Sequence, residues 1–378
     1  MTTERRVDRD AVEALLDTAI NRPHCVPGLP LADQDLLLRI ARRARVLGRL
    51  AADLDRAGLL QAMDSHAVDQ LRSALITAQA RNRLARWELD RIARAMHESP
   101  ATPLVALKGC AYLLLELPQA SGRVFADVDL LTDPARLDEV ESTLERHGWR
   151  SEELSPYDQN YYRRWTHELP PMKHPDRDME IDLHHNVLPR TARLKPPSAL
   201  LLRASRPVPG SRYRVLCNED IVLHAMTHLT FADDLADKLR ELVDIADLLR
   251  HFSTESDTFW ASFLQRAEEL DLRRPAYYGL RYAYRLLGVG VPAEVLEASG
   301  TWGPPAPVRQ LMDWLVPRAL YPYHPDSTHR HKELPRTLLY IRSHWIRMPP
   351  WLLAYHLAYK FVVARLRLRW RRSPAWNG

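Results

Sequence analysis

The sequence predicts an α+β fold in which a small mixed β-sheet lies between an N-terminal and a C-terminal helical region. Residues 10–100 and 218–287 repeat apolar residues at three- and four-residue spacing, which is the period of amphipathic helices. Between them, 104–107, 123–132 and 179–184 are short runs that are apolar or alternate in polarity, as strands do. We therefore expect four segments: a helical region over 1–100, an α/β core over 101–215, a helical lobe over 216–310 and a helical tail over 311–378.

The composition is that of an ordinary globular protein. The 378 residues, 46% hydrophobic and 27% charged, can bury a large core. The net charge of +5 is mild and lies largely in the C-terminal tail, so it does not by itself indicate a nucleic-acid partner. Cys25, Cys110 and Cys217 form no Cys-x-x-Cys pair, and the charged N-terminus lacks the apolar segment of a signal peptide. We expect a cytoplasmic protein without a cysteine zinc site.

The N-terminal region should be helical almost throughout, with breaks at the proline-rich segment 23–30 and near Asp64. Five arginines lie among its apolar residues: Arg39, Arg42, Arg43, Arg45 and Arg49. Such a run is either a solvated helix face or a nucleic-acid surface, and the first interpretation is favoured. This region is expected to pack against the core.

The core should begin after Pro103 with a buried strand over 104–107 and a helix over 110–117. Between them, Gly109 permits close approach of a phosphate to the backbone, and the free N–H groups of the helix would face that phosphate. Lys108 alone is a weak signal, because a single lysine is usually a surface residue.

The rest of the core follows from local patterns. After the strand 123–132, Asp133 is expected to cap a helix that ends at Gly148. Residues 149–169 should supply one or two strands, and 170–177 a turn before the strand 179–184.

Acidic side chains share one face of two predicted strands. Asp127 and Asp129 stand at i and i+2 in the first strand, and Glu180, Asp182 and His184 alternate with apolar residues in the second. If the strands are neighbours, they bring together three or four carboxylates, hard oxygen ligands that suit Mg²⁺. The alternative is a strand edge decorated with acids. The apolar flanks favour buried strands and therefore a metal site, with Glu180 as a bystander.

Zinc is not favoured at this site. His184 and His185 have no partner at His-x-His or His-x₃-His spacing, and hydrogen bonding is the preferred role for paired histidines after a strand.

The helical lobe should begin at Asn218, as the N-cap of a helix that runs to Phe231. Helices over 235–249 and 260–287 and a loop over 288–307 should follow. Two pairs of polar residues lie close together on these helices: His224 with His228, and Asp244 with Asp247. They could form a ligand cluster, but the favoured interpretation is that they are polar positions on amphipathic helices.

The tail combines aromatic and basic residues over 334–376. Its apolar stretch, 351–364, is too short and too interrupted to span a bilayer. An interfacial helix bound to anionic lipid and a helix packed on the lobe with a basic end are equally supported. A peripheral contact with the inner face of the membrane therefore stays open.

The two acidic strands resemble those of the nucleotidyltransferase superfamily typified by DNA polymerase beta. More narrowly, the motifs resemble a family of uncharacterised bacterial nucleotidyltransferases with a Lys-Gly, Arg, Asp-x-Asp signature. The resemblance extends from about Leu36 to about Gly290 and rests on these motifs: Leu107-Lys108-Gly109, Arg123, Asp127-Val-Asp129-Leu-Leu and Ile181-Asp182-Leu-His184.

The resemblance implies Mg²⁺-dependent transfer of a nucleotidyl group from a nucleoside triphosphate, such as ATP, to an acceptor hydroxyl on an unidentified small molecule, peptide or glycan. Asp127 and Asp129 would hold the metal, and Asp182 would share it and help to activate the acceptor. Gly109 would bind phosphate, and charge would be neutralised by two further residues, Lys108 and Arg123.

Cys110 departs from the family pattern, which has a small hydroxyl residue there and so one more hydrogen bond to phosphate. Two alternatives follow. One is a nucleotide- or partner-binding protein with weak catalysis, against which three mutually repelling carboxylates argue. The other is a membrane-associated enzyme that modifies a glycan, lipid or peptide.

Overall fold

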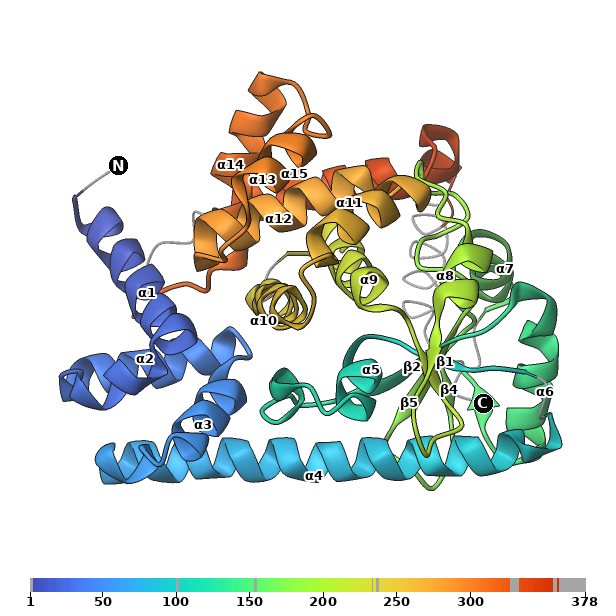
Figure 1. The fold of residues 1–378 in the computed structure, drawn as a ribbon, viewed down its shortest axis with the longest axis horizontal. Coiled ribbons are helices and arrows are strands. Elements are labelled where there is room, and N and C mark those ends of the chain that lie inside the picture. The colour runs from blue at the N-terminus through green and yellow to red at the C-terminus, as the bar shows by residue number, and fades with distance from the viewer. Residues whose placement is uncertain are drawn as a thin grey trace, which may run out of the picture.

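The computed structural model describes residues 3–99, 102–152, 155–232, 234–235, 238–326, 333–355 and 359. It confirms the α+β class: a mixed sheet and its short helices stand on one long helix, α4 (Ser65–Ala95), with a helical lobe above them (Figure 1). Most of the tail beyond Tyr355, including much of the predicted apolar stretch 351–364, lies outside the described residues.

One seven-stranded mixed sheet, in the order β3-β4-β5-β2-β1-β7-β6, contains the strands of the described chain. The two five-residue strands, β2 and β5, run parallel at its centre. β1 pairs antiparallel with β2 and parallel with β7. The strands are β1 (Val105–Ala106), β2 (Asp127–Leu131), β3 (Arg150–Ser151), β4 (Met172–Lys173), β5 (Glu180–His184), β6 (Arg206–Pro207) and β7 (Arg214–Val215).

The N-terminal helices confirm the prediction of a nearly all-helical region with breaks near 23–30 and Asp64. They are α1 (Thr3–Asn21), α2 (Leu31–Arg43), α3 (Leu47–Arg56) and α4. α4 begins where the Asp64 side chain accepts a hydrogen bond from the His66 N–H. Gly48 of α3 touches Gly122, and a Cβ on either would collide with the backbone of the other segment. This contact brings the N-terminal region against the loop that precedes Arg123.

The described residues of the core form the α-helices α5 (Lys108–Leu114), α6 (Leu137–Arg146), α7 (Pro156–Trp165) and α8 (Ser198–Ala204). The prediction of strands over 149–169 was wrong for most of that segment, since α7 fills it and only β3 and the bridge residue Glu168 pair as strands among its described residues. Ser155 caps α7 and Pro156 occupies its first turn, a helix start that outweighs the β propensity of the tyrosines. The turn predicted over 170–177 contains the short strand β4.

The strand predicted over 123–132 begins only at Asp127, and the helix predicted from Cys110 begins at Lys108. Asp133 does accept a capping hydrogen bond, from the Ala135 N–H, but in a 3₁₀ turn that precedes α6. These shifts move the ends of the elements and leave both acids of the first strand in place.

The described residues of the lobe form α9 (Asn218–Phe231), α10 (Leu239–Glu255), α11 (Phe259–Glu269), α12 (Arg273–Leu287) and α13 (Ala293–Gly300). Two helices follow, α14 (Ala306–Leu320), which crosses into the predicted tail, and α15 (Glu333–Arg347) within it. Cys217 rather than Asn218 precedes α9, because the Asn218 side chain accepts from Arg206 instead of capping the helix. The loop predicted over 288–307 contains α13, which starts directly after Pro292.

α15 packs against α9 and α14 and buries Leu339 between them. Arg342 donates a hydrogen bond to the Thr230 carbonyl, 3.1 Å away, which ties the helix to the end of α9. Within the described part of the chain, no helix is both long enough and apolar enough to cross a bilayer.

Candidate functional site

The three predicted acids meet where β2 and β5 run side by side. Asp129 stands opposite Asp182 in the parallel register, and the nearest carboxylate oxygens of Asp127, Asp129 and Asp182 lie within 4.8 Å of one another. Glu180 lies outside this group, with a carboxylate oxygen 3.7 Å from Lys173 Nζ. The parallel pairing therefore assembles the acid triad (Asp127, Asp129 and Asp182).

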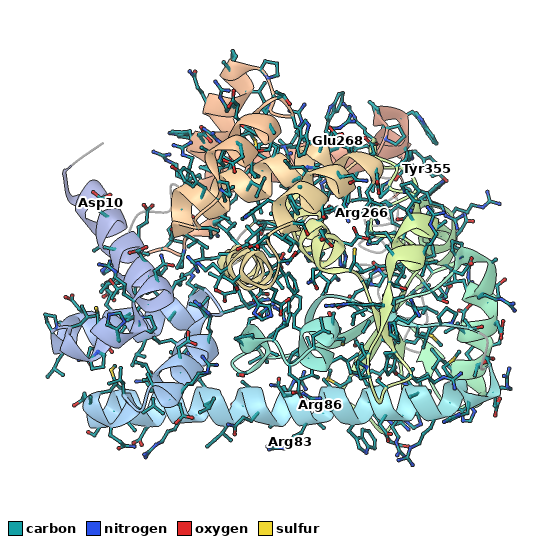
Figure 2. The ribbon with its side chains drawn as sticks, viewed as in Figure 1. Asp10, Arg83, Arg86, Arg266, Glu268 and Tyr355 are labelled. Atoms are coloured by element: carbon teal, nitrogen blue, oxygen red, sulfur yellow. The ribbon has the colours of Figure 1, made fainter. Side chains whose placement is uncertain are left out.

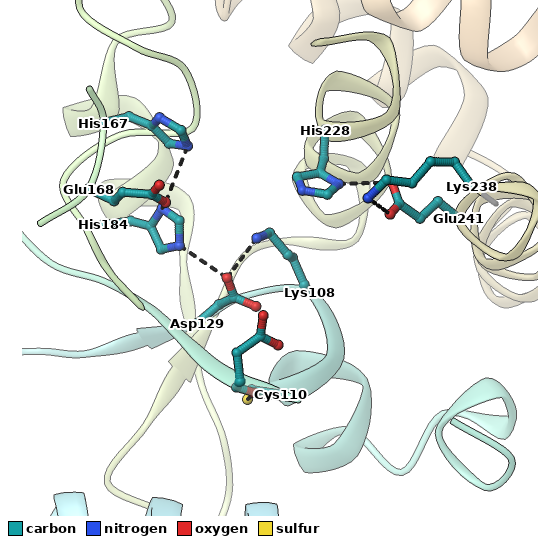
Figure 3. Close-up of polar contacts among 10 residues, drawn as sticks. Lys108, Cys110, Asp129, His167, Glu168, His184, His228, Lys238 and Glu241 are labelled. Atoms are coloured by element: carbon teal, nitrogen blue, oxygen red, sulfur yellow. Dashed lines mark hydrogen bonds and ion pairs between the residues drawn. The ribbon is translucent and has the colours of Figure 1, made fainter. Parts of the chain in front are cut away.

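Asp129 is the buried centre of the site, with 3% of its surface exposed. Its Oδ1 accepts from Lys108 Nζ at 2.6 Å and from His184 Nε2 at 3.1 Å (Figure 3). Burial alone would raise the pKa of this carboxyl, but the charges and hydrogen bonds of Lys108 and His184 outweigh burial and hold the pKa well below its usual range. Both hydrogen bonds go to Oδ1, so Oδ2 accepts none from the described residues.

The pKa values of the other two acids of the triad are shifted in the opposite direction. Burial, and then the charge of Asp129, raise the pKa of Asp127 above its usual range. The same two causes raise the pKa of Asp182 to about 7, and no described residue donates a hydrogen bond to it. Because Asp129 is ionised, its charge repels ionised carboxylates at Asp127 and Asp182, and a bound cation or proton relieves this repulsion.

Lys108 reaches Asp129 from an unusual backbone position. Its φ is 44°, in the left-handed region that non-glycine residues rarely adopt. Burial disfavours the charged ammonium, but the attraction of Asp129 outweighs burial and raises the pKa of Lys108. Such backbone strain concentrates at functional sites, where the surrounding structure holds it in place. The ammonium contacts a carboxylate of the triad at the edge of the pocket.

Gly109 and Cys110 line the packing side of α5. A Cβ on Gly109 would lie 2.6 Å from the Phe125 ring and 3.0 Å from Arg123 Nε, so the glycine lets α5 press against the segment that leads into β2. The Cys110 thiol is buried 3.9 Å from the Asp127 carbonyl, and burial raises its pKa. Cys110, which stands where the family has a small hydroxyl residue, therefore turns its side chain towards the strand β2.

Arg123 joins the core to the lobe through a buried ion pair with Asp244 of α10. Its guanidinium also lies over two rings, 5.5 Å from the centroid of Tyr112 and 5.8 Å from that of Phe125. Burial disfavours its charge, but Asp244 outweighs burial and the pKa of Arg123 is raised.

The polar pairs of the lobe do not form a metal cluster among the described residues. Asp247 pairs with Arg49 at 3.0 Å, and His228 lies 3.0 Å from Glu241. Asp244 pairs with Arg123, and both His224 and Asp244 are buried, so these two residues do not lie on the polar helix faces that were predicted for them.

A pocket of roughly 750 Å³ opens beside the acid triad, between the core, the N-terminal helices and the lobe. Six basic residues line it: Arg42, Arg45, Lys108, Arg123, Lys238 and Arg240. Polar residues of α4, Gln70, Ser73 and Thr77, form part of its wall. Arg42 and Arg45 are exposed, as the interpretation of the arginine run as a solvated face predicts, and they also line the pocket. Arg49 departs from that interpretation, because it is partly buried and pairs with Asp247.

Sequence reasoning missed two cations that line this pocket, Lys238 and Arg240. The Nε of Arg240 is buried without a hydrogen-bond partner, and no described carboxylate forms an ion pair with this residue. Burial, and then the charge of Arg123, lower its pKa. Lys238, by contrast, donates to Glu241 at 2.7 Å. No local pattern marked Arg240, since it is one charged residue on an amphipathic helix.

Two further residues missed by sequence reasoning extend the polar network beyond Asp129. Glu168 Oε2 lies 3.3 Å from His184 Nδ1 and 3.7 Å from His167 Nε2 (Figure 3). His167 and Glu168 lie in the segment between α7 and β4, where no motif pointed to them.

Carboxylates on two parallel strands beside a pocket lined by basic residues define an α+β domain whose site suits a metal ion and an anionic ligand. The model of a family described as an uncharacterised nucleotidyltransferase matches residues 30–288, and the chain belongs to that family. Comparison with curated proteins and with solved structures found no match. Family membership confirms the resemblance and supports nucleotidyl transfer as the general activity.

Proposed function

We propose that this protein transfers a nucleotidyl group from a nucleoside triphosphate to an acceptor hydroxyl, releases pyrophosphate, and depends on Mg²⁺. The observation that carries the proposal is the acid triad at the edge of a pocket lined by basic residues. The pocket volume of roughly 750 Å³ suits a nucleotide, since pockets for small ligands span about 300–1,000 Å³.

The donor set of the triad fits magnesium. Its three carboxylates are hard oxygen ligands, and Asp129 keeps Oδ2 free of hydrogen bonds from the described residues. Asp127, Asp129 and Asp182 would hold the ion. When bound, it supplies electrostatic stabilisation to the charge on the phosphate oxygens.

The basic residues divide into two groups by their partners. Lys108 and Arg123 are paired with Asp129 and Asp244, so they position the triad and the lobe. Arg42, Arg45 and Arg240 form no ion pair with a described carboxylate. Arg42 and Arg45 are exposed, whereas Arg240 is half-buried and its buried Nε has no hydrogen-bond partner, so Arg240 is the cation best placed to bind a phosphate.

Asp182 is the acid best suited to take the proton of the acceptor hydroxyl. In the metal-free chain, burial and the charge of Asp129 raise the pKa of Asp182 to about 7, and a bound cation would offset that charge and favour the ionised, proton-accepting form. No described residue donates a hydrogen bond to it, whereas Asp129 is already engaged by Lys108 and His184.

The test is incubation of the full chain with each labelled nucleoside triphosphate, Mg²⁺ and a cell extract, followed by a search for labelled product. Asp182→Asn should reduce transfer by orders of magnitude and leave triphosphate binding largely intact. Glu180→Gln is the matched control, since Glu180 lies on the same strand outside the triad. Unchanged turnover in Asp182→Asn would remove the proposed role.

The exposed face of α15 favours a second proposal, peripheral binding to an anionic membrane surface. Ile341 and Trp345 are 58% and 49% exposed on this helix, and Trp351 and Tyr355 are exposed beyond it. The sequence that follows is rich in arginine over 365–372. Apolar and aromatic residues beside basic ones suit an interface between lipid and water.

A further inference from the structure

A second group of metal-type ligands lies behind Asp129, on the side away from Lys108 (Figure 3). It consists of His167, Glu168 and His184, whose nearest ligand atoms all lie within 4.8 Å of one another. The two imidazole rings are 5.3 Å apart between centroids. This group, the His-Glu-His cluster, combines nitrogen and oxygen donors and is chemically distinct from the all-carboxylate triad.

Backbone pairing holds the cluster in place. The Leu169 N–H donates to the Leu183 carbonyl at 2.9 Å, and the His185 N–H donates to the His167 carbonyl at 2.8 Å. An antiparallel bridge joins Glu168 to His184 between these two bonds. The ligands therefore come from two segments whose backbones are fixed together, so little reorganisation is needed for an ion to bind.

One ring nitrogen at the centre of the cluster has no hydrogen-bond partner among the described residues. His184 is 2% exposed and uses Nε2 for Asp129, while its Nδ1 is buried without a hydrogen bond from any described residue. The Asp129 carboxylate can only accept, so Nε2 donates to it. Glu168 Oε2 lies 3.3 Å from Nδ1, an ion-pair contact when the imidazole is protonated, and a metal ion would take the place of that proton between the nitrogen and the oxygen.

We propose that His167, Glu168 and His184 bind a divalent first-row transition metal ion, with Zn²⁺ as the best fit. Two imidazoles and one carboxylate are a known ligand set for zinc that leaves a fourth position open. Zinc–ligand bonds of about 2.0–2.1 Å in a tetrahedron place neighbouring ligands about 3.4 Å apart. The separations of 3.3 Å and 3.7 Å from Glu168 Oε2 to the two histidines are close to that value.

Asp129 is the hydrogen-bond partner of His184 on the side away from the proposed metal ion. Metal-binding histidines commonly donate their second ring N–H to a carboxylate, which fixes the ring and its tautomer. The 3.1 Å contact from His184 Nε2 to Asp129 supplies this partner. Asp129 thus belongs to the acid triad and also supports the His-Glu-His cluster. The spacing of His184 and His185 did not favour zinc, because the second histidine ligand comes from a segment that β-pairing brings back.

The test is titration of the metal-free full chain with Zn²⁺ while Mg²⁺ is present in large excess to occupy the triad. We expect one zinc ion per chain, and about tenfold or greater weakening in His167→Gln and in Glu168→Gln. His147→Gln is the matched control, because it removes an exposed histidine 2.9 Å from Glu98, and it should bind zinc as the unmodified chain does.

Asp127→Asn separates this proposal from nucleotidyl transfer, since it should impair the triad and leave zinc binding within about twofold of the unmodified chain. Zinc-edge X-ray absorption of the unmodified protein gives a readout that does not depend on the folding of a variant, and it should show two imidazole nitrogens. Absence of stoichiometric zinc, a spectrum without imidazole, or unchanged affinity in both cluster variants would overturn the proposal.

Discussion

Replacement of Asp182 by asparagine should change how the stability of the metal-free protein depends on pH. Burial and the charge of Asp129 raise the pKa of Asp182 from 3.8 to about 7 in the folded chain. The folded state therefore binds this proton more tightly than the unfolded state does. The resulting stability is fully present below about pH 4 and is lost as the pH rises through about 7.

The expected size follows from the same two values. One pKa unit corresponds to about 1.4 kcal/mol, so the rise from 3.8 to about 7 gives an upper limit of about 4 kcal/mol between acid and alkaline solution. Asp182, the β5 member of the acid triad, is only partly buried, so the measured loss should be smaller. Asparagine cannot ionise, and the variant should lack this contribution to the pH dependence.

Urea denaturation at about pH 5 and about pH 8, in the presence of a chelator, measures the effect. The free energy of unfolding of the unmodified chain should fall between the two conditions by more than that of Asp182→Asn. Glu180→Gln should retain the unmodified pH dependence, because Glu180 lies outside the triad. Identical pH dependence in Asp182→Asn and the unmodified chain would refute the reasoning.

Three further outcomes are expected. Mg²⁺ at about a hundredfold above its Kd should raise the free energy of unfolding by about 2.7 kcal/mol, and Asp127→Asn should abolish this gain in thermal melts; equal gains in both proteins contradict the metal assignment. Arg240→Gln should weaken triphosphate binding about tenfold or more by calorimetry, whereas Arg83→Gln, on the outer side of α4 (Figure 2), should not, and equal affinities contradict the role of Arg240. A chain ending at Tyr355 should keep its Tm and lose sedimentation with anionic vesicles, while one ending at Leu334 should melt earlier because α15 packs on the lobe. Failure of the full chain to bind vesicles rules out the membrane contact.

The sequence by itself determined the features that depend on neighbouring residues. Side-chain alternation places Asp127 and Asp129 on one face of a strand and Asp182 on the matching face of another, because successive residues of any strand point to opposite sides. The apolar periodicity of the N-terminal region likewise predicted its helices, since an apolar stripe at helical spacing must be buried. In 149–169 the aromatic residues predicted strands, but a helix forms there because Ser155 and Pro156 provide a favourable helix start.

Only the tertiary structure decided which charged groups meet. Asp129 stands opposite Asp182 because β2 and β5 pair in parallel with this register. Arg123 finds Asp244, 121 residues away in the chain, through the packing of the lobe on the core. The same packing places Arg240 in the pocket without an ion pair to any described carboxylate, and strand pairing brings His167 to His184. The partner of a charged side chain depends on how distant parts of the chain pack together. The residues beside it in the sequence do not specify which group will lie opposite it in the fold.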